Sequence, residues 1–126
     1  MKRIISTDKA PAAVGPYSQA VEINSVLYIS GQIPLDPETG ILVSETDVKE
    51  QTKQVLTNIG HILDVAGYSF DDVVKSTVLL KNITDFAAVN EVYATFYSGS
   101  LPARVAFEAA NLPLGALVEI ETIAAK

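Results

Sequence analysis

The sequence predicts an α+β protein in which a mixed β-sheet carries two helices packed on one face. Segments rich in β-branched and alternating residues occupy the N-terminal third and the C-terminal quarter. Two segments with apolar residues at helical spacing lie between them, separated by one more strand-like segment. The order of strands, helix, strand, helix and strands is typical of a layer of helices on one side of a sheet.

Length and composition bound the class of protein. The 126 residues suit a single domain over residues 1–126, with an ordinary core. The apolar fraction is 48 % and the mean hydropathy is +0.27, yet no apolar run approaches the ~20 residues that span a membrane. The first residues lack the long apolar segment of a secretory signal, and the absence of cysteine fits a cytoplasmic protein without disulfides or zinc–thiolate sites. A net charge of −6 with scattered basic residues argues against nucleic-acid binding.

Strands are expected near both ends of the chain and once between the two helices. Residues 10–16 contain two prolines and are expected to be extended. Two strands, 18–24 and 26–30, are predicted around a tight turn, with Gly31 ending the second. Further strands are predicted over 73–81, 103–110 and 117–124, and the β-branched residues of the first of these support it.

Two helices are predicted between these strands. The first spans about 46–66, because its apolar residues recur at helical spacing, with Ser44 or Thr46 as its N-cap and Gly67 after its end. The second spans about 85–97 with Thr84 as its cap. Both helices on one face would leave apolar side chains uncovered on the other face of the sheet. We therefore expect a second copy of the chain to cover that face in a homo-oligomer.

Arg104 is the most informative single residue. It lies in the apolar stretch 101–107, which predicts a buried strand, and a buried guanidinium needs an anionic partner. Glu119 and Glu121 follow in the last apolar strand. Two interpretations remain open. Arg104 pairs with one of these acids, within one chain or across a subunit interface, in a purely structural role, or it binds the carboxylate of a small ligand through two N–H groups.

Three residues of the N-terminal third are candidates for a site. Tyr17 follows the stiff Gly15-Pro16 turn, where its phenol would orient a substrate or a water molecule, or would simply cover a core edge. Ser30 and Gly31 close a strand, where a hydroxyl and free N–H groups would bind a carboxylate or water. From the pattern alone, ordinary strand termination is the favoured interpretation of these two residues.

Other candidates lie in the second half of the chain. Asn90 lies beside an apolar position of the second helix, and small Ala106 next to Arg104 leaves room for a ligand. The single histidine, His61, is expected to face solvent, so a Ser/His triad is not predicted. One histidine and no cysteine make a metal site unexpected, and no phosphate-binding loop precedes either helix.

Five blocks in this order resemble the Rid (reactive intermediate deaminase, or YjgF/YER057c) family, and specifically its RidA branch. The resemblance covers essentially the whole chain. The blocks are Ala10-Pro11-Ala12-Ala13-Val14-Gly15-Pro16-Tyr17-Ser18-Gln19-Ala20, Ser30-Gly31-Gln32-Ile33-Pro34-Leu35-Asp36, Asp85-Phe86 with Val89-Asn90, Pro102-Ala103-Arg104, and Leu112-Pro113 with Val118-Glu119-Ile120-Glu121.

The resemblance implies a chorismate-mutase-like fold in a homotrimer with a central β-barrel and sites between subunits. It also implies hydrolysis of 2-imino acids such as 2-iminobutanoate and 2-iminopropanoate, released by pyridoxal-phosphate enzymes, to 2-oxo acids and ammonia, without metal or cofactor. By resemblance the carboxylate-binding arginine of the family is Arg104 and its water-positioning glutamate is Glu119. The other site residues of the family match Tyr17, Ser30, Gly31 and Asn90, and the Ala106 N–H is a further candidate for carboxylate binding.

Two departures from the family pattern bear on specificity. Val105 and Ala106 stand where the family often has serine and cysteine, and the 97–101 connection is shorter than in many relatives. Three alternatives to the deaminase stay open. They are a non-catalytic small-acid-binding regulator using the same cleft, a ribonuclease or translation inhibitor, and a purely structural trimer.

Overall fold

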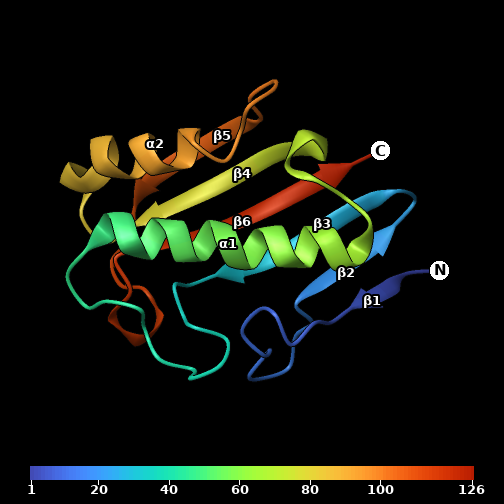
Figure 1. The fold of residues 1–126 in the computed structure, drawn as a ribbon, viewed down its shortest axis with the longest axis horizontal. Helices are drawn as coiled ribbons and strands as arrows, with labels where there is room; N and C mark the ends of the chain where they lie inside the picture. Colours follow the sequence, from blue (N-terminus) through green and yellow to red (C-terminus); the bar gives the residue numbers. More distant parts are fainter.

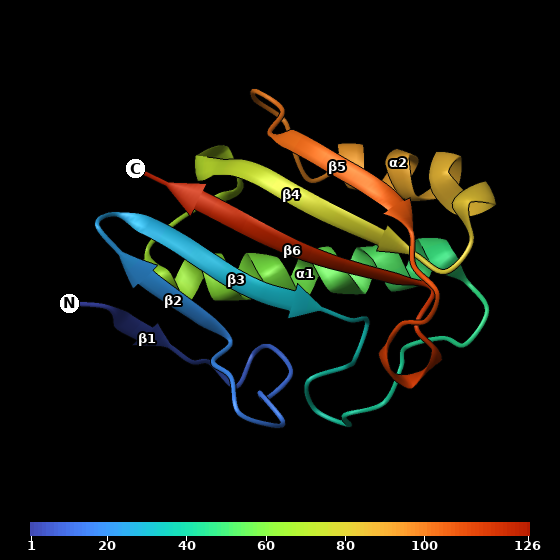
Figure 2. The same cartoon turned by 180° about the vertical axis from the view of Figure 1, so that it is seen from behind.

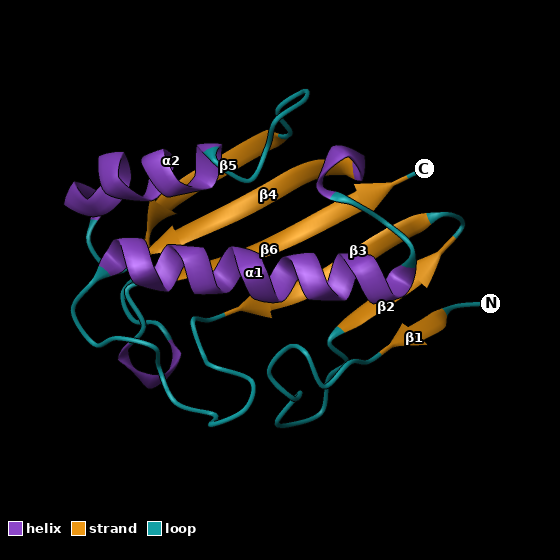
Figure 3. Ribbon diagram, in the orientation of Figure 1, coloured by secondary structure: helices purple, strands orange, loops and turns teal.

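The computed structural model describes residues 1–126 as one six-stranded sheet with two helices (Figures 1 and 3). The strands are β1 (Arg3–Ile5), β2 (Ala20–Ile23), β3 (Val26–Gln32), β4 (Val73–Leu80), β5 (Ala103–Glu108) and β6 (Val118–Ala125), and the helices are α1 (Val48–Ala66) and α2 (Phe86–Ala94). Three short 3₁₀ turns lie at Phe70–Asp72, Ile83–Asp85 and Pro113–Gly115. Neither helix is long and apolar enough to cross a membrane.

The sheet has the strand order β1-β2-β3-β6-β4-β5. Every neighbouring pair is antiparallel except β4 and β5, which are parallel and are connected through α2. Both helices lie on the same side of the sheet, and the view from behind shows no helix over β3, β6, β4 and β5 (Figure 2). The predicted mixed sheet with two helices on one face is confirmed. We call the uncovered side the open face.

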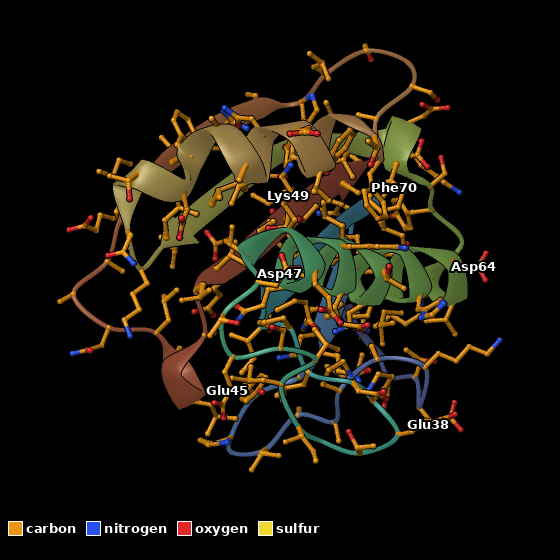
Figure 4. The ribbon with its side chains drawn as sticks, turned by 60° about the vertical axis from the view of Figure 1, so that its left-hand side comes forward. Glu38, Glu45, Asp47, Lys49, Asp64 and Phe70 are labelled. Atoms are coloured by element: carbon orange, nitrogen blue, oxygen red, sulfur yellow. The ribbon has the colours of Figure 1, made fainter.

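The helix α1 packs the apolar stripe predicted from its sequence. Six residues of that stripe are buried: Val55, Leu56, Ile59, Ile62, Leu63 and Ala66. Opposite them, alternate residues of β3, β4 and β6 point toward the helices and complete one hydrophobic cluster. Lys49 of α1 forms an ion pair with Glu91 of α2 at 2.8 Å and lies between the two helices in Figure 4.

The helix ends differ from the prediction in detail. Asp47, not Ser44 or Thr46, is the N-cap of α1, because its carboxylate accepts hydrogen bonds from the N–H groups of Lys49 and Glu50. Gly67 ends α1 with φ of 84°, as predicted. The second helix is shorter than predicted, because residues 83–85 form a separate 3₁₀ turn and the chain leaves the helix after residue 94.

The strand that carries Arg104 is where prediction and structure disagree most. β5 lies at the edge of the sheet, beside β4 only, so Arg104 is exposed and not buried. β4 separates β5 from β6, so the strands of Arg104 and Glu119 do not adjoin. The apolar side chains that suggested burial, Val105 and Phe107, are 45 % and 49 % exposed on the open face. A further short strand, β1, was not predicted.

Candidate functional site

Arg104 projects toward the helix side of the sheet, into a cavity of about 400 Å³ beneath α2. Its Nη1 donates a hydrogen bond of 2.7 Å to Oδ1 of Asn90, and the guanidinium lies over the rings of Phe86 and Tyr93. Leu101 and Pro102 from the segment before β5 complete the wall. This arginine cavity therefore brings together two of the predicted site residues, Arg104 and Asn90.

The Arg104 guanidinium has no acidic partner within the chain. The two ion pairs of the protein involve other residues, Arg3 with Glu22 and Lys49 with Glu91. The interpretation in which Arg104 pairs with Glu119 or Glu121 of its own chain is therefore wrong. Because one N–H group of a guanidinium suffices for Asn90, the remaining donors are free for a planar anion such as a carboxylate.

Glu119 projects on the other side of the sheet. It lies between Val118 and Ile120, whose side chains are fully buried beneath the helices, so the alternation of β6 turns Glu119 to the open face. Its carboxylate lies directly against Gly31 of β3. A methyl group on Gly31 would overlap Glu119 Oε2 and would lie 3.1 Å from Cδ. Only glycine leaves room for the carboxylate at this place.

An irregularity in the sheet creates this close approach. The pairing of β3 with β6 runs from Ile29 opposite Thr122 to Gln32 opposite Ile120, so two residues of β3 face one residue of β6. Such a bulge bends the strand and redirects its side chains. The two residues involved are the predicted site residues Ser30 and Gly31.

The surroundings of Glu119 favour proton exchange. Burial raises the pKa of the Glu119 carboxyl above its usual value, and the negative charge of Glu121 two residues along the strand raises it further. A carboxyl whose pKa moves toward neutrality can both accept and return a proton. The other shifted carboxyl, Glu22, lies in an exposed network with Arg3, which lowers its pKa by a hydrogen bond.

A second cavity, of about 470 Å³, opens beside Gly31. Tyr17, which is 52 % exposed, forms part of its wall. Gly15 has φ of 121° just before Pro16, and this turn sets the direction of the tyrosine. Pro113 and Leu114 contribute apolar surface to the same cavity. This tyrosine cavity brings together the predicted residues Tyr17 and Gly31.

Ser30 supports the wall of the tyrosine cavity. Its hydroxyl donates to the carbonyl of Ser18 at 2.7 Å, and its backbone N–H donates to the carbonyl of Gln19 at 3.0 Å. These bonds join the end of β3 to the segment that follows Tyr17. The hydroxyl oxygen keeps lone pairs with which it can accept a hydrogen bond from a ligand or water.

Three buried amide side chains hold the loops around the tyrosine cavity, and the sequence analysis missed all three. Gln19 donates to carbonyls of the loop before Tyr17 and accepts from the Thr7 N–H. Asn58 of α1 donates to the Leu35 carbonyl. Gln51 of α1 donates to one loop, at residue 44, and accepts from another, at residue 117. Each amide satisfies backbone groups that have no strand partner.

The remaining candidates lie outside both cavities. Ala106 packs against the hydrophobic core and does not line the arginine cavity of the single chain. His61 is exposed, as predicted, and its Nδ1 lies 2.7 Å from the Lys9 carbonyl. No three side chains of histidine, aspartate or glutamate converge in a way that would hold a metal ion.

The two cavities lie apart in a single chain. Arg104 is paired in register with Ser76, which is buried beneath the helices, whereas Glu119 faces the open side. Figure 2 shows β5 along one edge of the sheet and the loops after β1 and β3 at the opposite end of the molecule. One chain therefore separates the candidates into two groups, which we call half-sites. Arg104 and Asn90 lie at the arginine cavity, and Tyr17 and Gly31 line the tyrosine cavity, with Ser30 and Glu119 next to Gly31.

Known proteins share both the sequence and the fold of this chain. A family model described as endoribonuclease L-PSP matches residues 7–126. A crystal structure of a conserved Rid-family protein from Yersinia pestis superposes with a TM-score of 0.96 at 49 % identity, over 100 % of both chains. The chain belongs to the Rid family. The family membership predicted from the sequence is thereby confirmed, and so is the α+β fold.

Two further Rid relatives have informative names. The 2-iminobutanoate/2-iminopropanoate deaminase of Mus musculus is 56 % identical over 124 residues, which cover 98 % of this chain and 91 % of the mouse protein. Escherichia coli TdcF, solved with bound serine, superposes with a TM-score of 0.94 at 40 % identity, over 98 % of each chain. One Rid relative is thus named as an enzyme of imino acids, and another binds a small amino acid.

Proposed function

We propose that this Rid protein is a 2-iminobutanoate/2-iminopropanoate deaminase, which hydrolyses reactive imino acids to 2-oxo acids and ammonia. The observation that carries the proposal is the Arg104 guanidinium, held in a cavity with donors to spare and without an acidic partner. A 2-imino acid supplies the planar carboxylate that such a group binds. The deaminase from mouse, at 56 % identity, supports the same substrate class.

The half-sites require a second copy of the chain, because Arg104 and Glu119 face opposite sides of the sheet. We propose a homotrimer in which the open faces form a central barrel and the arginine cavity of one subunit meets the tyrosine cavity of the next. The apolar side chains on the open face support this arrangement, since Tyr28, Val105 and Phe107 are all more than two-fifths exposed in one chain. We place the enzyme in the cytoplasm, consistent with a chain without cysteine.

The chemistry follows from these groups. Arg104 binds the carboxylate through two N–H groups, with help from the N–H groups of Gly31 and Ala106. A water molecule held by Glu119 attacks the protonated imine carbon, so that a C–O bond forms while Glu119 accepts a proton. Glu119 returns the proton to nitrogen. It then accepts the hydroxyl proton of the tetrahedral intermediate as the C=O bond forms, the C–N bond breaks and ammonia leaves the 2-oxo acid. That last proton passes to ammonia or to solvent, which restores the Glu119 carboxylate. Such general acid–base assistance is worth roughly 10²–10⁴-fold in rate.

Tyr17 and Ser30 complete the proposed site. The phenol at the wall of the tyrosine cavity orients the water or the imine nitrogen, and the Ser30 hydroxyl accepts a hydrogen bond while it donates to the Ser18 carbonyl. Asn90 fixes Arg104 from the side of α2. Because a protonated imine is already electrophilic, the residues of the two half-sites suffice for this route.

The test couples the protein to threonine dehydratase with semicarbazide as a trap for the released imine. We expect faster 2-oxobutanoate release and less semicarbazone, and we expect Arg104→Ala to remove both effects. Arg3→Ala is the matched control, because Arg3 is the only other arginine and pairs with Glu22 on β2. An unchanged yield of trapped imine at every protein concentration would overturn the proposal.

A small-acid-binding regulator is the second candidate, and the serine bound to E. coli TdcF favours it. A regulator needs Arg104 but does not need Glu119. Glu119→Gln separates the two functions: in the deaminase, 2-oxobutanoate binding persists while imine turnover falls by roughly 10²–10⁴-fold. Turnover that survives this substitution would remove Glu119 from the mechanism.

The description of the family model raises a third candidate, an endoribonuclease. The net charge of −6 disfavours it, because RNA-binding surfaces carry clustered lysine and arginine. The single histidine, His61, lies against the Lys9 carbonyl and outside both cavities. Incubating highly purified protein with RNA tests this function, and cleavage that Arg104→Ala abolishes would support a nuclease at the same site.

A further inference from the structure

One face of α2 is built around the guanidinium of Arg104. Phe86, Asn90 and Tyr93 follow one another at spacings of four and three residues, so they lie on the same side of the helix. The Arg104 guanidinium carbon lies 5.2 Å from the centroid of the Phe86 ring and 5.1 Å from that of Tyr93. Both distances are within the range of cation–π attraction. Asn90 adds the hydrogen bond of 2.7 Å described above.

The Tyr93 ring is itself fixed by further aromatic contacts. It is 5 % exposed and stacks on Tyr97 with ring centroids 4.8 Å apart. Tyr97 and Phe70 pack edge to face, with ring centroids 5.3 Å apart. Phe70 in turn packs against α1 at Gly60, where a ring carbon lies 3.1 Å from the position that a methyl group on this glycine would take. Figure 4 shows Phe70 beside α1. A chain of aromatic rings thus joins the first helix to Arg104.

The contacts with the two rings leave the binding capacity of the guanidinium intact. Ring faces attract the cation without accepting its N–H hydrogens in the way a carboxylate does. The guanidinium is therefore restrained while its donors, apart from the one bonded to Asn90, stay available. This matters because Arg104 lies on an exposed edge strand, where a long side chain is otherwise mobile. Immobilising such a side chain on binding lowers affinity by roughly 2- to 10-fold.

We propose that Phe86 and Tyr93 are positioning residues that restrain the Arg104 guanidinium and so pre-organise it for the substrate carboxylate. The inference rests on the proposed role of Arg104 as the carboxylate ligand. Each ring is proposed to act through Arg104. Phe86 lies outside the lining of the arginine cavity, whereas Tyr93 also forms part of its wall. Losing one ring face, with the bulk of the side chain retained, should weaken carboxylate binding about 2- to 5-fold.

The experiment compares variants that keep or remove the ring. Tyr93→Leu and Phe86→Leu remove a π face, whereas Tyr93→Phe keeps the ring and removes only the hydroxyl. Calorimetric titration with 2-oxobutanoate gives the affinity for a carboxylate without any turnover, and steady-state kinetics with 2-iminobutanoate separates KM from kcat. Both leucine variants should bind about 2- to 5-fold more weakly and raise KM while kcat stays within about two-fold, and Tyr93→Phe should bind like wild type.

A double-mutant comparison ties the effect to Arg104. When Arg104 is already replaced by alanine, adding Tyr93→Leu should not lower the affinity for 2-oxobutanoate any further. If Tyr93→Leu unfolds the protein, as circular dichroism would show, the more exposed Phe86→Leu carries the test alone. The inference would be overturned if the leucine variants bound 2-oxobutanoate like wild type, or if Tyr93→Phe bound it as weakly as Tyr93→Leu. It would also be overturned if binding to the wild-type protein did not depend on Arg104. Binding without turnover would instead refute the deaminase and leave the restraint on Arg104 supported.

Discussion

Replacing Gly31 with alanine is expected to remove most of the activity and to leave the fold intact. The new methyl group would overlap Oε2 of Glu119 and would lie 3.1 Å from its Cδ and 3.4 Å from its Cγ. Gly31 does not have a positive φ, so alanine is not strained there by its own backbone. The half-buried carboxylate is therefore the group that must move. A displacement on the order of 1 Å at a reacting group lowers the rate about 10²-fold.

The assay for Gly31→Ala is the rate of 2-iminobutanoate hydrolysis, measured beside the thermal unfolding midpoint. Gly99→Ala is a matched control, because its methyl group would meet the exposed Asp71 carboxylate at 2.9 Å, outside the lining of either cavity. If the alanine acts by displacing Glu119, the double variant with Glu119→Gln should be no slower than Glu119→Gln alone. Full activity of Gly31→Ala, or losses that multiply in the double variant, would refute this reasoning.

Two predictions concern stability. Glu119→Gln should raise the unfolding midpoint at neutral pH, because a raised pKa means that the folded protein holds this proton more tightly than the unfolded chain does. As the pH rises above 4.5, the usual pKa of a glutamate, ionisation of Glu119 lowers the free energy of unfolding of the wild type only. Calorimetric scans of variant and wild type should therefore converge below about pH 4. Gln51→Leu should lower the free energy of unfolding in urea by about 2–4 kcal/mol, because one loop carbonyl and one loop N–H lose their buried partner.

The elements with regular patterns could be predicted from the sequence. The apolar stripe of α1, the alternation of β6 and the glycine that ends α1 all depend on residues close together in the chain. The same spacing also contained a signal that was missed. Gln51 lies three residues after Val48 and four before Val55, which places this polar side chain on the buried stripe, where it needs hydrogen-bond partners.

The position of Arg104 could not be predicted in the same way. Its strand has the composition of a buried strand, but the apolar side chains of Val105 and Phe107 lie on the open face of the sheet. Arg104 itself is an exposed residue of an edge strand. Whether a strand lies at an edge depends on long-range pairing, here the parallel pairing of β4 with β5. The contact of Glu119 with Gly31 likewise depends on the bulge between β3 and β6, which joins segments nearly 90 residues apart.

The proposed arrangement of half-sites makes a quantitative prediction about mixed assemblies. Arg104→Ala retains the tyrosine cavity with Glu119, and Glu119→Gln retains the arginine cavity, so each variant alone should be inactive. In a trimer with sites between neighbours, a site is intact only where an Arg104-containing subunit meets a Glu119-containing one in the correct order. Dissociating the two variants, mixing them in equal amounts and reassembling them should therefore restore about a quarter of wild-type activity by random combination.

The size of this recovery separates the possible architectures. A site built within one chain would give no recovery, because every subunit in the mixture lacks one of the two residues. The control is the mixture before dissociation, which should stay inactive if subunits exchange slowly. Arg104 lies on the helix side of the sheet and Glu119 on the open face, so the two side chains of one chain cannot contact the same small substrate. Mixtures that remain inactive after verified subunit exchange would show that Arg104 and Glu119 do not act in one intersubunit site.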